Sequence, residues 1–190
     1  MDSGELELLL QNTVLRDRQS AMDILVAHAW LLIPDVRCDL LSNGRQGVYH
    51  SVRFGPECEA DFLTYEIMER QVNWQVTYIA SPSAAILENS MPSIEFAHAL
   101  RQIDLWRDSI SHCEDRFTVP LPILDLTAKF SYRIVIGQSL HQTDDERHEV
   151  QCHRRNDLRI RSFDWLIQKL SYYSQSEFAL LEKLGPVKAL

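Results

Sequence analysis

The chain has 190 residues, 45% of them hydrophobic, so it can bury a core of its own, and its length suits one domain better than two. Its net charge of −8 argues against a protein that grips nucleic acid over a wide surface, because phosphate contacts need clustered Lys and Arg. No secretory signal pattern follows Met1, and no apolar run approaches the roughly 20 residues that span a bilayer. We therefore expect a cytoplasmic protein that does not enter a membrane.

The first half of the chain predicts helices followed by strands. Apolar residues recur at helical spacing from Leu6 to Leu15 and from Gln19 to Leu32, and Pro34 ends the second pattern. Asn43-Gly44 is a turn signal, and the segment Val48 to Phe54 alternates as a strand does. Two helices and a strand are therefore expected before residue 55.

The middle of the chain predicts a hairpin and a long helix. Ala60 to Tyr65 and Gln75 to Ala80 are strand-like, and the polar segment Glu66 to Asn73 predicts the turn between them. Pro82 and Pro92 bracket a loop or short helix. From Ser93, which suits an N-cap, apolar residues spaced by three and four predict a helix to about Cys113.

The remaining segments complete an α/β pattern. They are a loop at Pro120 and Pro122, a strand from Tyr132 to Gly137, an exposed helix from Asp144 to Arg155, a strand from Leu158 to Phe163, a helix from Ser162 to Leu170 capped by Ser162, and a short helix after Ser174. This order predicts a mixed α/β (α+β) domain at residues 19–172, with a helical extension at 1–18 and a helical tail at 173–190.

Several short motifs follow one another in this frame. They are His28-Ala-Trp-Leu-Leu32, Asp61-Phe62, Val76-Thr-Tyr-Ile-Ala-Ser-Pro82, the trio Ala99, Gln102 and Trp106, Ile134-Val-Ile-Gly137, the charged helix Asp144 to Asn156, and Ile160 to Leu166. Their order resembles the PD-(D/E)XK nuclease superfamily, and specifically the Shedu nuclease domain of bacterial anti-phage defence. The resemblance covers roughly Gln19 to Leu170 and implies a restriction-endonuclease-like core, a central mixed sheet flanked by helices.

The resemblance also implies where a nuclease site would lie. In the active enzymes two carboxylates bind Mg²⁺ and a lysine orients or activates the attacking water. Alignment places Asp61 at the first carboxylate, Tyr78 at the second, Ala80 at the lysine and Gln102 at the helix glutamine. Tyrosine is neutral near pH 7 and alanine carries no charge, so Asp61 alone would be a weak metal ligand at best. We therefore expect a catalytically degenerate site that needs no cofactor.

The first helix offers no replacement at the position where the family often adds a glutamate. Arg18 and Ser20 fall there, and Asp23 is nearby. A rearranged site would need Glu59 or Glu66 as the second carboxylate, and Lys129 or Arg101 as the cation. Strand alternation opposes Glu66, whereas Glu59 shares a strand face with Asp61 at period two.

The only basic concentration is formed by Arg154, Arg155, Arg159 and Arg161, which are candidate nucleic-acid contacts. A solvated helix end and a charged edge strand would explain them equally well. Trp30, Trp74, Trp106 and Trp165 are expected in the core, with base stacking as the lesser alternative. The alternative to a site role for Gln102 is a half-buried amide that forms a hydrogen bond with the neighbouring strand.

The four cysteines, Cys38, Cys58, Cys113 and Cys152, form no CxxC pair, so we expect unpaired and largely buried thiols. A zinc site is a weaker alternative. It would use His148 and Cys152, four residues apart, with His141 and His153 beside them. Because this spacing matches no closed zinc signature, we do not expect one.

Three functions follow as hypotheses. The first is a Shedu-like, inactive nuclease-fold protein that binds DNA or a defence-system partner protein. The second is a metal-dependent DNA endonuclease with a rearranged site, the only one of the three that requires Mg²⁺. The third is a structural or oligomerising protein with no nucleic-acid role, which the acidic balance favours. In a homo-oligomer, exposed apolar residues from Phe178 to Leu184 would form the interface helix.

Overall fold

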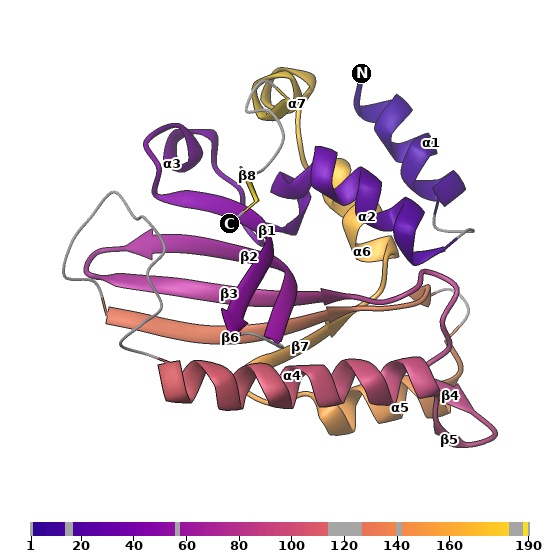
Figure 1. Cartoon of the computed structure of the whole chain (residues 1–190). Coiled ribbons are helices and arrows are strands. Elements are labelled where there is room, and N and C mark those ends of the chain that lie inside the picture. The colour runs from indigo at the N-terminus through magenta and orange to yellow at the C-terminus, as the bar shows by residue number, and fades with distance from the viewer. Residues whose placement is uncertain are drawn as a thin grey trace.

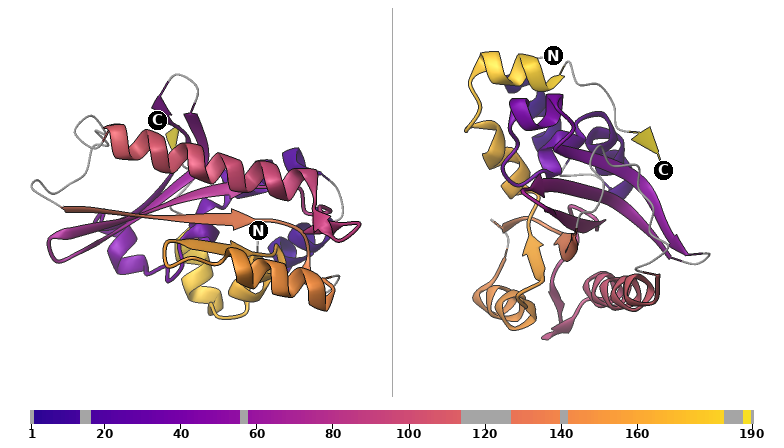
Figure 2. Two further views of the ribbon diagram at one scale, coloured as in Figure 1. Left: turned by 90° about the horizontal axis from the view of Figure 1, so that it is seen from below. Right: turned by 90° about the vertical axis from the view of Figure 1, so that its left-hand side faces the viewer.

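A computed structural model describes residues 2–13, 17–55, 58–113, 127–139, 142–182 and 188–189, and in it a six-stranded mixed sheet lies between two layers of helices (Figures 1 and 2). The strand order is β7-β6-β3-β2-β1-β8. The strands are β1 (Gln46–Gly55), β2 (Cys58–Met68), β3 (Gln71–Ile79), β6 (Thr127–Val135), β7 (Leu158–Arg161) and β8 (Lys188–Ala189). This confirms the α/β expectation at the level of a mixed sheet flanked by helices.

The helices follow the predicted order, with short elements between them. They are α1 (Ser3–Thr13), α2 (Arg18–Ala27), the 3-10 helix η1 (Ala29–Leu32), α3 (Cys38–Ser42), α4 (Ile94–Cys113), α5 (Asp144–His153), α6 (Asp164–Leu170) and α7 (Gln175–Glu182). Within the described ranges, none of them is long and apolar enough to cross a bilayer.

Strands β1, β2 and β3 form an antiparallel meander, and the chain then crosses through α4 to β6, which runs parallel to β3. Tyr78 of β3 lies opposite Ile134 of β6. Strand β7 adds in parallel on the far side of β6 and is one edge of the sheet. The ends of β3 and β6 therefore lie side by side, close to where α4 begins (Figure 1).

Each face of the sheet has its own core. On one face, α4 contributes a stripe spaced by three and four, as expected of an amphipathic helix: Phe96, Ala99, Ile103, Trp106 and Ile110. On the other face, α1, α2, η1, α6 and α7 pack together and bury Leu6, Leu25, Trp30, Leu166 and Phe178. The two cores lie on opposite sides of the strands (Figure 2).

Some local predictions are wrong. The expected helix from Gln19 to Leu32 is two elements, because α2 ends at Ala27 and η1 begins at Ala29. The segment between Pro82 and Pro92 holds a small hairpin, β4 (Leu87–Glu88) with β5 (Met91–Pro92). The polar turn is shorter than expected, because β2 pairs with β3 as far as Met68 opposite Gln71.

Other corrections concern side chains. Phe163 rather than Ser162 holds the N-cap position of α6, and it makes no side-chain capping bond. Phe178 is buried at 2% exposure, so the expected exposed interface helix is wrong at that residue. Cys58 is buried as predicted, but Cys152 is exposed. The loop predicted at Pro120 and Pro122 lies outside the described residues.

Candidate functional site

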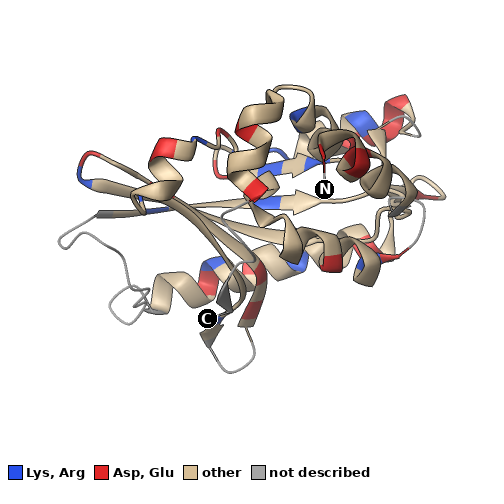
Figure 3. Ribbon diagram, turned by 90° about the horizontal axis from the view of Figure 1, so that it is seen from above, with Lys and Arg blue, Asp and Glu red and all other residues tan. Residues whose placement is uncertain are grey.

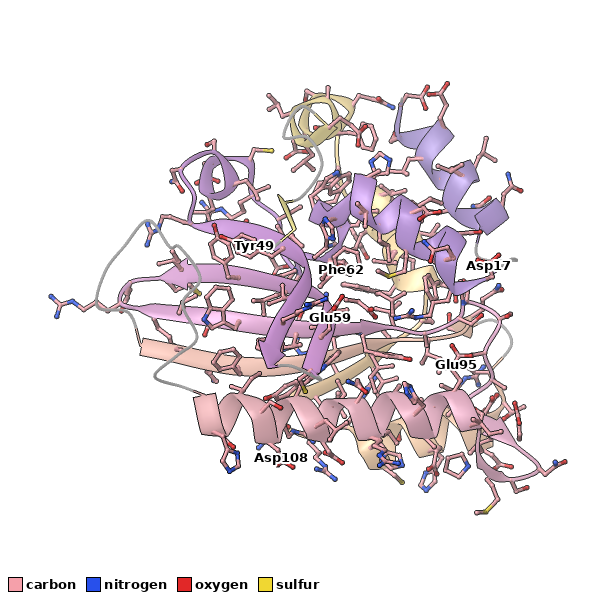
Figure 4. All side chains as sticks on the ribbon, in the orientation of Figure 1. Asp17, Tyr49, Glu59, Phe62, Glu95 and Asp108 are labelled. Carbon is pink, nitrogen blue, oxygen red and sulfur yellow. The ribbon has the colours of Figure 1, made fainter. Side chains whose placement is uncertain are left out.

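The candidate site lies where four elements meet at one end of the sheet. Arg18 is the first residue of α2, Asp61 is on β2, Tyr78 is on β3, and the start of α4 carries Glu95. Asp17, the N-cap of α2, and Glu95 lie toward this same end of the sheet (Figure 4). The side chains therefore come from segments that are far apart in the sequence.

Arg18 joins Asp61 to the backbone of β3. Its Nη2 atom lies 2.7 Å from Oδ1 of Asp61, and its Nε donates to the carbonyl of Ile79 at 2.6 Å. The second carboxylate oxygen of Asp61 accepts from the amide of Ile79 at 2.7 Å. Both oxygens of the carboxylate and the neighbouring carbonyl are thus already engaged.

The Asp61 carboxylate is more deeply placed than its partner. Its side chain is 16% exposed, whereas that of Arg18 is 43% exposed. Burial raises the pKa of Asp61 above its ordinary value, although the Ile79 amide and the Arg18 guanidinium act in the opposite direction. Among the described residues, the Arg18 guanidinium is therefore the one opposite charge in direct contact with this carboxylate.

Tyr78 occupies the remaining side of the Arg18 guanidinium, whose carbon lies 5.4 Å from the centre of the phenol ring. The phenol oxygen is 3.1 Å from Nδ1 of His98 on α4. Burial raises the pKa of Tyr78, so the phenol stays neutral at ordinary pH. A neutral phenol is a poor metal ligand and a poor nucleophile.

Ala80 and Glu95 complete the wall of the site. Ala80 is fully buried, and its amide donates to the carbonyl of Val135 on β6 at 2.8 Å. The carboxylate of Glu95 accepts from the amide of Ser81. Glu95 therefore stabilises the chain as it leaves β3, and it is committed to that backbone group.

The residues proposed for a rearranged site are engaged elsewhere or lie far from Asp61, although Glu59 is near enough for its charge to raise the pKa of Asp61. Glu59 pairs with Arg53, and Glu66 accepts from Gln46. Lys129 lies opposite Asn73, five residues along β3 from Tyr78, which is about 16 Å at the rise of a strand. Asp23 accepts from Gln19 on the exposed side of α2.

Two further candidates lie on α4. Gln102 is half-buried and follows His98 by one helical turn, and Arg101 is exposed. The role of Gln102 as a site residue stays a prediction.

A divalent cation does not fit this donor set. The lone carboxylate is paired with a guanidinium, and the two flanking motif positions carry a neutral phenol and a methyl group. Among the described residues, no group of three or more His, Cys, Asp or Glu is arranged to hold a metal. For the zinc alternative, His148 lies 3.5 Å from Cys152 and His153 pairs with Glu149, while His141 is outside the described residues.

The four predicted nucleic-acid-binding arginines lie around the edge strand β7 and the end of α5. Arg154 and Arg161 line one pocket with Trp165. Arg155 lines another, with Asp104 and Arg107. Arg159 is exposed on β7. The cluster is therefore divided between two pockets and a strand edge, in a molecule that otherwise mixes both signs of charge over its helices (Figure 3).

Sequence reasoning missed the partners of Asp61 and Tyr78. In the sequence Arg18 is only a residue without a carboxylate at the expected position, and neither His98 nor Glu95 stands out. A usable signal existed on α4, because Glu95, His98 and Gln102 recur at helical spacing and make a polar stripe beside the apolar one. No comparable signal marks Arg18, which is 43 residues from Asp61.

Comparison with known proteins adds no relationship. No family model matches the chain. No curated protein matches it significantly either.

Proposed function

We propose that the chain is a nuclease-like domain of the PD-(D/E)XK type, similar to the Shedu domain of anti-phage defence, that acts by binding nucleic acid and does not cut it. The order of its elements supports the proposal: a helix, an antiparallel three-stranded meander, a helix, and a strand parallel to the third. On that frame the motif positions Asp61 and Tyr78 are neighbours around one guanidinium.

The observation that carries the proposal is the bridge from Arg18 to Asp61 and to the Ile79 carbonyl. A cation placed beside Asp61 would have to displace the guanidinium or share two oxygens with it. Like charges at such distances repel strongly in a partly buried setting. Mg²⁺ also needs one or two carboxylates, usually with substrate phosphate, and keeps most of its water. The guanidinium of Arg18 therefore supplies, next to the Asp61 carboxylate, the positive charge that a metal ion would otherwise supply.

The arginines at the end of α5 and on β7 are the proposed contacts for nucleic acid. None of Arg154, Arg155, Arg159 and Arg161 forms an ion pair with a described carboxylate, so their charge is available to phosphate. Their small number fits a local contact, as the net charge of −8 requires.

Absence of cleavage is the first test. Plasmid, linear duplex and single-stranded DNA are incubated with the protein and Mg²⁺ or Mn²⁺, with EDTA as the control. We expect no product above the EDTA background. Metal-dependent cutting that disappears in Asp61→Ala would overturn the proposal in favour of an endonuclease with a rearranged site.

Binding is the second test, by mobility shift of DNA and RNA at low salt and at rising salt. We expect a complex that weakens steeply with salt, since each phosphate contact releases counterions. Arg155→Gln combined with Arg159→Gln should weaken it several-fold. No shift of any nucleic acid at low salt would instead favour a structural or oligomerising protein, including a homo-oligomer or the complex of a defence system.

A further inference from the structure

A pocket of about 230 Å³ lies between the end of α5, strand β7 and helix α6. Two arginines line it, Arg154 at the C-cap of α5 and Arg161 on β7, together with Trp165 of α6. The rest of its polar lining is neutral, from serine and glutamine side chains, and no carboxylate is among the described residues that line it. This composition differs from the acidic average of the chain.

The two arginines lack compensating charge. Neither guanidinium is within ion-pair distance of a carboxylate in the described part of the chain. The nearby Asp164 accepts instead from the amide and hydroxyl of Ser139. Burial, with the like charges of Arg154 and Arg159, lowers the pKa of Arg161. The positive charges at the pocket therefore destabilise one another when it is empty of anions.

Two further basic side chains lie against the indole of Trp165. The guanidinium carbon of Arg133 is 4.6 Å from the ring centre and the Lys169 ammonium is 5.1 Å from it. These side chains are 1% and 5% exposed, and their hydrogen bonds go to neutral carbonyls of the 31–33 segment. The Nε atom of Arg133 is buried without a partner. The indole of Trp165 is therefore in contact with buried basic side chains and with Arg161 of the pocket, whose guanidinium carbon is 5.8 Å from the ring centre.

We propose that this pocket binds a phosphomonoester, a small ligand with a doubly charged phosphate group. A guanidinium presents paired donors that match phosphate geometry, and Ser162, Gln142 and Gln168 can donate to the remaining oxygens, whereas the hydroxyl of Ser139 is committed to Asp164. The volume is below the ~300–1,000 Å³ of pockets for drug-sized ligands, which suits a phosphate with a small substituent. The inference rests on the proposed function in that it uses two of the same arginines. A small phosphate nevertheless binds whether or not a polymer does.

The test is calorimetric titration of the full chain at low salt with inorganic phosphate, with adenosine monophosphate and with a sugar phosphate. Adenosine and sulfate-free buffer are the blanks. We expect all three phosphates to bind and adenosine not to bind. Stronger binding of one ester than of inorganic phosphate would show which kind of substituent on the phosphate, nucleoside or sugar, the pocket favours. No binding of any phosphate would overturn the inference.

A matched pair of double variants separates the pocket from simple net charge. Arg154→Gln with Arg161→Gln should weaken phosphate binding about tenfold or more, since each removes a charged hydrogen bond. Arg101→Gln with Lys129→Gln changes the net charge equally at two exposed residues that do not line the pocket, and it should alter phosphate binding less than about twofold. Equal losses in both doubles would overturn the pocket as the site.

A third variant protects the test against misfolding. Gln168 lines the pocket and is exposed, so Gln168→Glu places a carboxylate at the rim without disturbing the core. We expect it to weaken phosphate binding at least as much as the double variant, and unchanged binding would contradict the pocket. If the protein shifts duplex DNA but does not bind phosphate, this inference is rejected and the proposed function stands. If it binds phosphate but shifts no nucleic acid, the proposed function is rejected and this inference stands.

Discussion

Single cations hold much of this molecule together by donating to backbone oxygens. Arg18 donates to Ile79, Arg133 to Leu32, and Lys169 to Leu31 and Ile33. The Lys169 ammonium is 5% exposed and ties α6 to the end of η1. Burial and the neighbouring Arg133 lower the pKa of Lys169 to about 7, so folding opposes protonation of this residue.

The pH dependence of stability should report this lysine. Between about pH 7 and the unfolded pKa near 10.5, the unfolded chain binds a proton that the folded chain has released. The free energy of unfolding should therefore rise with pH in this window, by at most ~1.4 kcal/mol per unit. Urea unfolding at pH 7, 8 and 9 measures the slope. Lys169→Met should remove it, while exposed Lys129→Met should not; equal slopes in all three proteins would contradict the shift.

The strand that carries Tyr78 could be predicted from the sequence, but the partners of Tyr78 and Asp61 could not. The β-branched and aromatic residues that predict a strand from Gln75 to Ala80 are a local signal, and the strand ends one residue earlier, at Ile79. The contact between Arg18 and Asp61 depends on how α2 packs over the end of the sheet, which no spacing in the sequence encodes. The pocket at Trp165 could not be predicted from the sequence either, because Arg154 lines it whereas the next residue, Arg155, lines another pocket.

At the scale of elements, Glu146 joins α5 to the segment that leads into α4. One of its carboxylate oxygens accepts from the amides of Ile86 and Leu87, and the other closes a capping box with Thr143. Although burial acts to raise the pKa of Glu146, the amides of Thr143, Leu87 and Ile86 lower it below the ordinary value. The carboxylate is therefore stabilised in its charged form.

Glu146→Gln should lower the free energy of unfolding by ~1–3 kcal/mol at pH 7, since the charge-assisted bonds are weakened or lost. Because the folded pKa is depressed, the stabilisation is present above the unfolded value and disappears as the pH falls through the folded one. The difference from the wild type should thus shrink toward pH 3. Asp145→Asn, an exposed change in the same first turn, controls for the helix dipole. A cost that does not depend on pH would contradict this role.

The element boundaries show where prediction from sequence failed. Strands β1, β2 and β3 were predicted because their apolar and β-branched residues recur over six or more positions. The break between α2 and η1 was missed because His28 interrupts the helix without Pro or Gly, and its ring instead bonds Glu182 of α7. A tertiary contact of this kind leaves no local mark.

At the scale of the whole molecule, one sheet is shared by two cores. Trp106 is buried on the α4 face and Trp30 on the α2 face, and the strands between them belong to both. Loss of either helical layer would expose a full face of the sheet to water. The two cores should therefore unfold together, as single domains of this size usually do.

This cooperativity is testable with one truncation on each face. Leu25→Ala and Ile103→Ala each remove a fully buried side chain and should cost ~2–5 kcal/mol. Urea unfolding followed by circular dichroism and by tryptophan fluorescence should give coincident midpoints in both variants. Midpoints that separate in one variant would show that its face unfolds independently.

The Arg18 bridge also determines how a metal site could be engineered into this chain. Tyr78→Glu and Ala80→Lys would rewrite the motif, yet the new carboxylate would meet a guanidinium already bound to Asp61. Tyr78→Glu alone would add a second carboxylate to that salt bridge, so the variant would not hold a metal cation better than the wild type. The effective barrier therefore stands 43 residues before Asp61, at the first residue of a helix, and Arg18 must be replaced before metal ligands introduced at positions 78 and 80 could take effect.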